Sequence, residues 1–378
     1  MKKHDWLKQI QFWLPLIVAS IYVVKACSLP NMATPPSPSK QVVANTLSLQ
    51  ELWRWSGVVP YGRNHPPKLI IQKNLVILAI TDREATRYTN KLIALDAQTG
   101  TLIWETKPTF EGPDSLYADQ ERVYVSYLRY VQAFDLATGQ ELWRGAQQST
   151  YKKGGLHVYA SESQVKVYDT DTTRYSLNSR QFILDAKTGE TKNVNDWPGL
   201  FFEQNNIYYA SDLIGGSFGA GMIAKDKGSS DTLWRLDTTG LVRQWPIIVE
   251  NMMYLDAGDI YAFHPDTGET YWIFEDTDVI EPKSGSVDKR YKNTLIARIA
   301  YGGNRLYFIR SDGAVVGLNP KTGQPTGIIE IEPRPNFYES DGLFKDTAYL
   351  IAASDQFVAV YYNDSDELIV FKRQDVAE

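Results

Sequence analysis

The chain contains 378 residues, of which 43% are hydrophobic and 22% charged, a balance typical of a packed globular protein and not of a disordered or collagen-like chain. Its 10 Trp, 23 Tyr, 14 Phe and 26 Gly favour pleated strands joined by tight turns over a helical bundle. The formal net charge is −6, and residues 1–26 hold four lysines and one aspartate, so the remainder carries −9. A surface of that charge without a basic stripe argues against nucleic acid as a partner.

The single cysteine, Cys27, excludes an intramolecular disulfide and a cysteine-based zinc cluster. The four histidines are widely spaced, which argues against a His-rich metal site. We therefore expect no resident metal ion.

Residues 1–26 have the pattern of an export signal. Three lysines precede an apolar run over Ile10–Val24, which is short for a spanning helix of about 20 residues and suits the core of a signal peptide. Ala26 then precedes Cys27, as at a bacterial lipoprotein cleavage site, although Lys25 occupies a position that is normally small and uncharged. Lipidation of Cys27, plain cleavage after Ala26 and an uncleaved anchor all remain open. Each predicts an exported chain, and an anchored one would lie on the periplasmic or extracellular side of a membrane.

The segment after Cys27 has the composition of a tether. Residues 28–40 contain four prolines among serines and threonines, a composition that favours an extended, semi-rigid chain over packing. We assign residues 27–48 to this tether and expect the folded body to stand off a membrane surface.

A short phrase recurs six times in the body of the chain. Its turn glycines are separated by 39, 50, 39, 40 and 55 residues, and periods of this length with several short strands each are typical of propeller blades. The copies span Leu92–Trp104, Val131–Trp143, Arg180–Lys192, Gly221–Trp234, Ile260–Trp272 and Ala314–Gly327.

Each copy predicts a β-hairpin. An alternating strand such as Leu92–Leu95 leads into an Asp or Asn, whose side chain bonds the backbone of the turn, and then into Thr-Gly, where the glycine supplies a positive φ. A tryptophan four residues past the glycine, such as Trp104, falls on the outer strand, where we expect it to wedge between neighbouring sheets. Further strands precede each hairpin and bring the count to four per unit.

The carboxyl end of the chain lacks one strand, because only three are expected after residue 346. The segment Leu49–Ser56 has no hairpin partner, so we expect it to complete the last blade and hide two sheet edges. The prediction is an all-β fold: a single β-propeller of seven four-stranded antiparallel blades over residues 49–373, closed by an N-terminal strand and followed by a tail at 374–378. Long intervals between some repeats leave eight blades as the alternative.

The phrase, as it stands in LDAQTGTLIW, FDLATGQELW and FHPDTGETYW, closely resembles the PQQ-like repeat family of β-propellers, also called quinoprotein-like propellers. The resemblance implies two functional branches, namely dehydrogenases that use pyrroloquinoline quinone (PQQ) with calcium and non-catalytic propellers that bind proteins. Dehydrogenases of this kind stack the quinone on a disulfide between adjacent cysteines, which a chain with one cysteine cannot supply. We therefore expect no PQQ and no enzyme activity.

The layout of lipidation signal, tether and compact propeller is similar to that of the propeller lipoproteins in the outer-membrane β-barrel assembly machinery. These are scaffolds without an active site, and the resemblance implies a role in envelope assembly. They differ from our expectation for this chain in having eight blades.

Three motifs suggest chemistry but fit the repeat pattern better. Gly215–Gly219 matches the G-x-S-x-G nucleophile elbow of hydrolases, yet an elbow opens into a helix and Ala220–Lys225 reads as a strand. Asp169–Asp171 and Asn363–Glu367 cluster oxygen ligands of the kind that calcium prefers, but neither has EF-hand spacing, and both read as solvated turns.

Taken together, the sequence predicts an exported, membrane-tethered, monomeric propeller that acts as a scaffold for a protein partner in the cell envelope. A small-ligand-binding or sensory propeller and a PQQ-dependent oxidoreductase are the alternatives. We expect the partner to contact long loops on one face and two tryptophans outside the turn register. The candidate partner-binding residues are Gly215, Gly216, Phe218, Trp197, Trp245, Lys283 and Arg290.

Overall fold

The computed structural model divides the chain into two compact units, residues 1–37 and residues 38–378. The residues that it describes all belong to the second unit, so Cys27 and most of the predicted tether lie outside them. No helix in the described part is long and apolar enough to cross a lipid bilayer. The described residues are 39–57, 68–84, 87–146, 154–160, 163–171, 179–197, 203–211, 221–229, 231–239, 246–275, 299–310, 313–333, 349–362 and 365–374.

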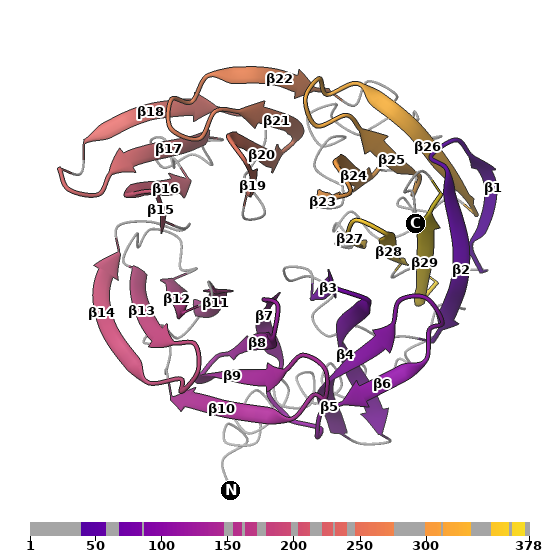
Figure 1. Ribbon diagram of the computed structural model, residues 1–378, viewed down its shortest axis with the longest axis horizontal. Coiled ribbons are helices and arrows are strands. Elements are labelled where there is room, and N and C mark those ends of the chain that lie inside the picture. The colour runs from indigo at the N-terminus through magenta and orange to yellow at the C-terminus, as the bar shows by residue number, and fades with distance from the viewer. Residues whose placement is uncertain are drawn as a thin grey trace, which may run out of the picture. The chain divides into compact units, whose positions relative to one another are not determined.

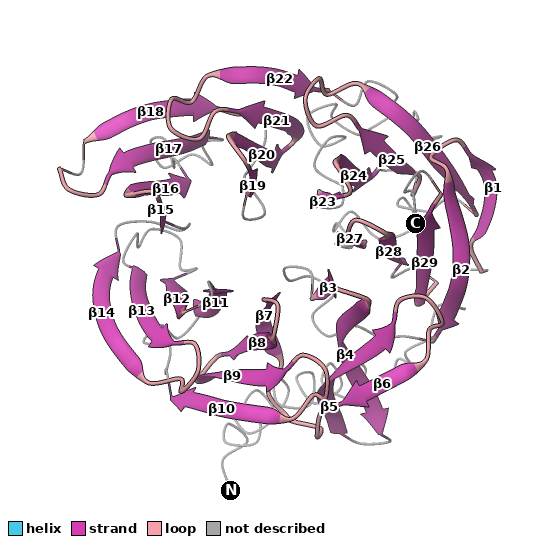
Figure 2. Cartoon of the chain, viewed as in Figure 1, coloured by secondary structure: helices cyan, strands magenta, loops and turns pink. Residues whose placement is uncertain are grey.

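Within these residues, 29 strands form seven antiparallel sheets, and no helix occurs (Figure 2). Six sheets have four strands, and one has five. The sheets lie around a common centre, each with its first strand innermost (Figure 1). The predicted all-β propeller is confirmed, with seven blades.

We number the blades in chain order and give their strands from the centre outward. Blade 1 contains β3 (Leu69–Gln72), β4 (Leu75–Glu84), β5 (Arg87–Asp96) and β6 (Leu102–Glu105). Blade 2 contains β7 (Pro113–Ala118), β8 (Arg122–Tyr127), β9 (Tyr130–Asp135) and β10 (Glu141–Ala146). Blade 3 contains β11 (Gly154–Ala160), β12 (Gln164–Asp171), β13 (Ser179–Asp185) and β14 (Thr191–Trp197). Blade 4 contains β15 (Glu203–Gln204), β16 (Ile207–Ser211), β17 (Gly221–Asp226) and β18 (Thr232–Asp237).

The last three blades follow the same order, but blades 6 and 7 also use strands from the start of the chain. Blade 5 contains β19 (Ile247–Val249), β20 (Met252–Ala257), β21 (Asp259–Phe263) and β22 (Thr270–Phe274). Blade 6 contains β23 (Ala300–Gly302), β24 (Arg305–Ile309), β25 (Val315–Leu318), β26 (Pro325–Glu332) and, outermost, β1 (Gln41–Asn45). Blade 7 contains β27 (Leu350–Ala353), β28 (Phe357–Tyr362), β29 (Glu367–Arg373) and β2 (Leu49–Ser56).

Two N-terminal strands close the ring. Strand β2 pairs with β29 in blade 7, from Leu49 opposite Arg373 to Ser56 opposite Glu367, as predicted. Strand β1 was not predicted, because residues 41–45 lie in the segment that we assigned to the tether. It pairs antiparallel with β26, so that residues 39–48, which we call the N-terminal strap, join blade 6 to blade 7 (Figure 1).

Antiparallel pairing places the connections of each blade on two faces of the ring. The turn face carries the turns between first and second strands and between third and outermost strands. The loop face carries the connections between second and third strands and from each blade to the next.

The Thr-Gly turns on the turn face have the predicted hydrogen bonds. In blade 2, Asp135 Oδ1 accepts hydrogen bonds from the backbone N–H groups of Ala137 (3.1 Å) and Thr138 (2.8 Å). Gly139, at φ 67°, donates its N–H to the carbonyl oxygen of Asp135 at 2.9 Å. The hydrogen bonds from Thr138 and Ala137 to the carboxylate lower the pKa of Asp135.

A tryptophan on the outermost strand locks each of five blades to the next. Its indole Nε1 donates a hydrogen bond of 2.7–2.9 Å to a carbonyl oxygen in the following blade, and its ring packs on that blade's turn glycine. A Cβ atom at Gly139 would lie 2.6 Å from Cδ2 of Trp104, so the contact requires glycine. The pairs are Trp53 with Gly100, Trp104 with Gly139, Trp143 with Gly189, Trp234 with Gly268, and Trp272 with Gly323.

Two junctions depart from this pattern in the described residues. On β14, Asn193 stands four residues past Gly189, so blade 3 meets blade 4 without the tryptophan. On β26 the equivalent position is Gly327, and the N-terminal strap fills the space. Thr46 donates its N–H to the carbonyl oxygen of Ile328 at 2.8 Å, and Leu47 is buried in the core between blades 6 and 7.

Replacing a locking tryptophan tests this packing. Trp104 is 6% exposed, so we expect Trp104→Ala to lower the free energy of unfolding by about 3–5 kcal/mol, because it leaves a cavity and removes the donor to Leu136 O. Leu102, on the same strand, is 48% exposed, and Leu102→Ala should cost less than about 0.5 kcal/mol. Urea titration of both variants measures the difference. Equal losses would contradict the locking role.

Candidate functional site

The residues that we predicted to bind a partner lie almost entirely outside the described part of the chain. This applies to Gly215, Gly216, Phe218, Trp245, Lys283 and Arg290. Trp197 is the last residue of β14, where its backbone pairs with Ser179. The other six positions lie in segments whose structure is not described. Their role in binding stays a prediction.

The structure tests the hydrolase and calcium-site interpretations of three sequence motifs. Gly221–Asp226 is strand β17, so the G-x-S-x-G motif does not open into the helix that a nucleophile elbow needs. The prediction of solvated turns is wrong for two carboxylates: Asp169 is buried within β12, and Glu367 is the buried first residue of β29. No group of three or more His, Cys, Asp or Glu side chains could hold a metal ion within the described ranges.

Exposed apolar side chains on the loop face form a candidate binding surface at the junction of blades 1 and 2. Phe110 is 71% exposed and lies in the connection from β6 to β7. Leu128 is 43% exposed and lies at the tip of the β8–β9 hairpin. With Tyr130 and Arg144, they form what we call the 110/128 patch; Tyr127 is buried in the core, at 3% exposed, and Tyr130 packs against it.

The backbone beside Phe110 is fixed by hydrogen bonds. Thr109 and Asn90 exchange two backbone hydrogen bonds of 2.7 and 2.8 Å, which tie the connection to β5. The Thr109 hydroxyl also donates to the carbonyl oxygen of Glu111 at 2.8 Å. The exposed phenyl ring is therefore presented by an ordered segment, which lowers the entropy lost when a partner binds.

Tyr130 and Arg144 form the rest of the patch, and the buried Tyr127 supports Tyr130. The rings of Tyr127 and Tyr130 lie 4.6 Å apart, and the guanidinium carbon of Arg144 lies 4.7 Å from the centroid of Tyr130. Burial raises the pKa of both tyrosines, and the charge of Glu111 raises that of Tyr130 further, so both phenols are neutral. An aromatic side chain beside an arginine, as at Tyr130 and Arg144, is typical of binding hot spots.

The outermost strands offer exposed apolar residues of another kind. Leu142 on β10 and Leu233 on β18 are 46% and 47% exposed, close to the value of Leu128. They stand on separate blades at the rim of the ring, and isolated apolar residues of this kind are normal on a protein surface. They provide matched controls for the patch.

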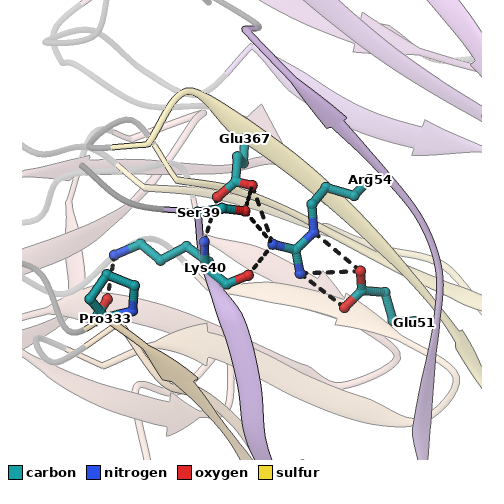
Figure 3. A network of polar contacts seen from close by, with 6 residues as sticks. All are labelled: Ser39, Lys40, Glu51, Arg54, Pro333 and Glu367. Carbon is teal, nitrogen blue, oxygen red and sulfur yellow. Dashed lines mark hydrogen bonds and ion pairs between the residues drawn. The ribbon is translucent and has the colours of Figure 1, made fainter. Parts of the chain in front are cut away.

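A second cluster of polar side chains fixes the N-terminal strap to blade 7 (Figure 3). We call it the strap clamp, and it consists of Ser39, Lys40, Glu51, Arg54 and Glu367. Glu367 accepts hydrogen bonds from the Ser39 hydroxyl at 2.6 Å and from the Lys40 backbone N–H at 2.7 Å. Arg54 donates to Glu367 at 3.2 Å and also to the carbonyl oxygen of Lys40. On its other side, Arg54 forms an ion pair of 3.1 Å with Glu51.

Lys40 joins this cluster to blade 6. Its buried ammonium group donates to the carbonyl oxygen of Pro333 at 2.7 Å and lies 5.7 Å from the ring centroid of Tyr362. One residue of the strap thus contacts the end of β26 and strand β28. The clamp therefore holds the strap at the point where blades 6 and 7 meet.

The hydrogen bonds of the clamp favour the ionised form of Glu367. Burial alone would raise the pKa of this carboxyl group, which is 2% exposed. The hydrogen bonds from Lys40 N–H, Ser39 and Ser365, with the charge of Arg54, outweigh burial and leave the pKa below its usual value.

Sequence reasoning missed both clusters. Phe110 is an apolar residue in an otherwise polar connection between two repeats, a signal that could have marked it. The clamp had no such signal, because Ser39 and Glu367 are 328 residues apart.

Comparison with known proteins identifies a family. The family model described as "Outer membrane protein assembly factor BamB" matches residues 51–196 and 183–374, which confirms the resemblance drawn from the repeats. No curated protein matches the chain. A crystal structure of BamB from Moraxella catarrhalis is 16% identical over 86% of this chain and 99% of that chain, with a TM-score of 0.46. The computationally designed Ika8 protein is 16% identical over 85% and 99%, with a TM-score of 0.48.

The clamp predicts a pH-dependent contribution to stability. A lowered pKa stabilises the fold above the unfolded value of about 4.3, and that stability is lost as the pH falls through the folded pKa. We expect Glu367→Gln to lower the free energy of unfolding by about 1–3 kcal/mol at pH 7. The difference from the unsubstituted protein should shrink below pH 4, as measured by thermal unfolding at several pH values.

Glu51→Gln is the matched control, because Glu51 bonds the same arginine from a more exposed position. It should cost less than about 0.5 kcal/mol. A Glu367→Gln effect that is unchanged between pH 7 and pH 3 would contradict the assignment.

Proposed function

Because this chain belongs to the family of the outer membrane protein assembly factor BamB, we propose that it is a non-catalytic scaffold that binds a protein partner in the cell envelope, in the assembly of outer-membrane proteins. The ring acts as a monomer and presents its loop face to that partner. The name of the family supports an envelope location. The signal-like residues 1–26 and the sequence around Cys27 support export and lipid anchoring.

The observation that carries this proposal is the 110/128 patch. It combines Phe110 and Leu128, both well exposed, with Tyr130 and the guanidinium group of Arg144 on one face of the ring. Exposed apolar clusters of this kind on otherwise polar surfaces mark sites of protein association. The locked blades keep the patch in fixed geometry, so little conformational entropy is lost on binding.

The proposal excludes a quinone enzyme of the PQQ-like repeat family. The resemblance implies a disulfide between adjacent cysteines beneath the quinone, and the chain has one cysteine, at the predicted lipidation site. The scaffold therefore acts without PQQ or a catalytic metal ion, and its activity is the binding of its partner.

Affinity capture tests the proposal. The tagged full-length chain is crosslinked in cells, recovered from detergent-solubilised envelopes and examined by mass spectrometry. We expect an outer-membrane assembly protein to be recovered with the unsubstituted chain and to fall at least about tenfold with Phe110→Ala/Leu128→Ala, because hot-spot truncations cost more than 1 kcal/mol each.

The double variant Leu142→Ala/Leu233→Ala removes apolar surface of similar exposure from the rim and should retain the partner. Equal loss with both double variants would contradict a role for the patch. Recovery of nothing above a control that carries only residues 1–48 would contradict the scaffold function itself.

A further inference from the structure

We propose that the ring opens preferentially at the junction of blades 3 and 4, where both members of the tryptophan–glycine lock are replaced and the facing side chains are polar or only half-buried. This inference goes beyond the proposed scaffold function, because it concerns how the ring moves and depends neither on membrane anchoring nor on a partner. It distinguishes an opening junction from the locked junction that carries the 110/128 patch.

The sequence lacks both members of the lock at this junction. The tryptophan position of blade 3, four residues past Gly189, is the exposed Asn193. In blade 2 the turn glycine stands four residues past the aspartate that begins the turn, whereas four residues past Asp226 in blade 4 the chain has Ser230. An asparagine supplies neither the buried indole ring nor its N–H donor. The contact that holds five other junctions is therefore missing here.

The two sides of blade 3 differ in burial. Val165 and Val167, which face blade 2, are completely buried. On the other side, Lys166, Ile183 and Asn193 form one row across β12, β13 and β14. The Lys166 side chain is 20% exposed, Ile183 is half-buried and Asn193 is exposed. Blade 3 is thus close-packed against blade 2 but not against blade 4.

Blade 4 shows the same difference between its sides. Tyr209, Ala224 and Trp234 face blade 5 and are at most 8% exposed. Because side chains alternate along a strand, Tyr208 and Ile223 point to the opposite side, towards blade 3, and both are only half-buried. Side chains of both sheets therefore keep contact with water at the junction of blades 3 and 4.

The ion pair across this junction is long. Lys166 Nζ lies 3.9 Å from Glu203 on β15, whereas Glu203 forms a shorter pair of 2.7 Å with Lys227 of its own blade. Burial lowers the pKa of Lys166, and the charge of Glu203 does not offset this effect. The ammonium group therefore gains hydration when the blades separate, and a long pair in contact with water contributes little stability.

One buried side chain of blade 3 reaches the core of the next blades. Tyr168 is 1% exposed and belongs to the same core cluster as Ile207 and Tyr209 of blade 4. Its neighbour on β13 is Gln181, which is also 1% exposed but polar. Exposing a phenol and an amide to water costs less free energy than exposing aliphatic side chains and an indole ring, as at a locked junction.

The junction of blades 6 and 7 shows that loss of the tryptophan alone does not open a junction. There the N-terminal strap places Leu47 in a buried apolar cluster, and the backbone of Thr46 contacts Gly327. Among the described residues, no segment takes this part between blades 3 and 4. Polar contacts therefore close this junction, where apolar packing closes the others.

Opening at this place leaves the sheets and the 110/128 patch intact. All backbone ladders lie within single blades, so two blades can separate without breaking a strand pair. The patch lies between blades 1 and 2, where Trp104 packs on Gly139. The ring therefore changes its width while the binding surface keeps its geometry.

Native-state thiol labelling tests the opening. The reporter is Gln181→Cys, between blades 3 and 4, and the matched control is Ala94→Cys, a buried position on the equivalent strand between blades 1 and 2. The full-length chain reacts with a maleimide at several urea concentrations below the unfolding midpoint. Labelling is read from the peptide that carries the new cysteine, so Cys27 does not interfere.

We expect labelling at position 181 to be at least about tenfold faster than at position 94 without urea, because local opening is populated more than global unfolding. Its rate should also rise less steeply with urea, since a local opening exposes less surface.

Restoring the lock separates the missing contact from the effect of the new cysteine. Adding Asn193→Trp and Ser230→Gly to the Gln181→Cys chain should slow its labelling at least about fivefold, because a locked junction opens less often. Lys166→Met replaces the ammonium group by an apolar chain of similar length and should slow labelling in the same direction. This single substitution keeps the test decisive where the restored lock does not fold.

Equal labelling at positions 181 and 94, or a urea dependence at position 181 equal to that of global unfolding, would overturn the proposal. Fast labelling that neither the restored lock nor Lys166→Met slows would assign the exposure to the cysteine itself and would also overturn it. Partner capture through the 110/128 patch is measured separately, so the opening and the scaffold function can fail independently.

Discussion

The contact between an outer-strand tryptophan and the turn glycine of the next blade is the interaction on which the ring depends. It combines burial of an indole ring with a hydrogen bond from Nε1, and it tolerates no side chain at the glycine. Because the same pair recurs at five junctions, neighbouring blades keep nearly the same relation around the ring. The two faces of the propeller are therefore rigid surfaces on which loops can hold side chains in fixed positions.

The N-terminal segment completes both the packing and the hydrogen bonding of this ring. Trp53 on β2 forms the lock between blades 7 and 1, while Thr46 and Leu47 occupy the junction of blades 6 and 7, where Gly327 replaces the tryptophan. Strand β1 covers the edge of β26 that would otherwise be open to pairing with another chain. Closure of the ring thus depends on strands β1 and β2 at the start of the described chain.

The repeat made most of the fold predictable from the sequence. Local spacing indicates the hairpins, the wedge position of Trp104 and the missing strand that Leu49–Ser56 supplies, because each depends on residues close in the chain or on a period. Strand β1 and the clamp at Glu367 depend on partners some 300 residues away, which no local pattern indicates. Glu367 was predicted to lie in a solvated turn for that reason, and Phe110 was not predicted because it lies in a short connection between repeats.

A rigid ring that carries the 110/128 patch on one face supports a function in binding a protein partner. In-cell photocrosslinking tests that claim most directly, with a photoreactive amino acid in place of Phe110 or, as the control on the rim, of Leu142. A discrete adduct with one envelope protein is expected from position 110 and not from position 142. The absence of an adduct at position 110, or the same adduct from both positions, would contradict the account.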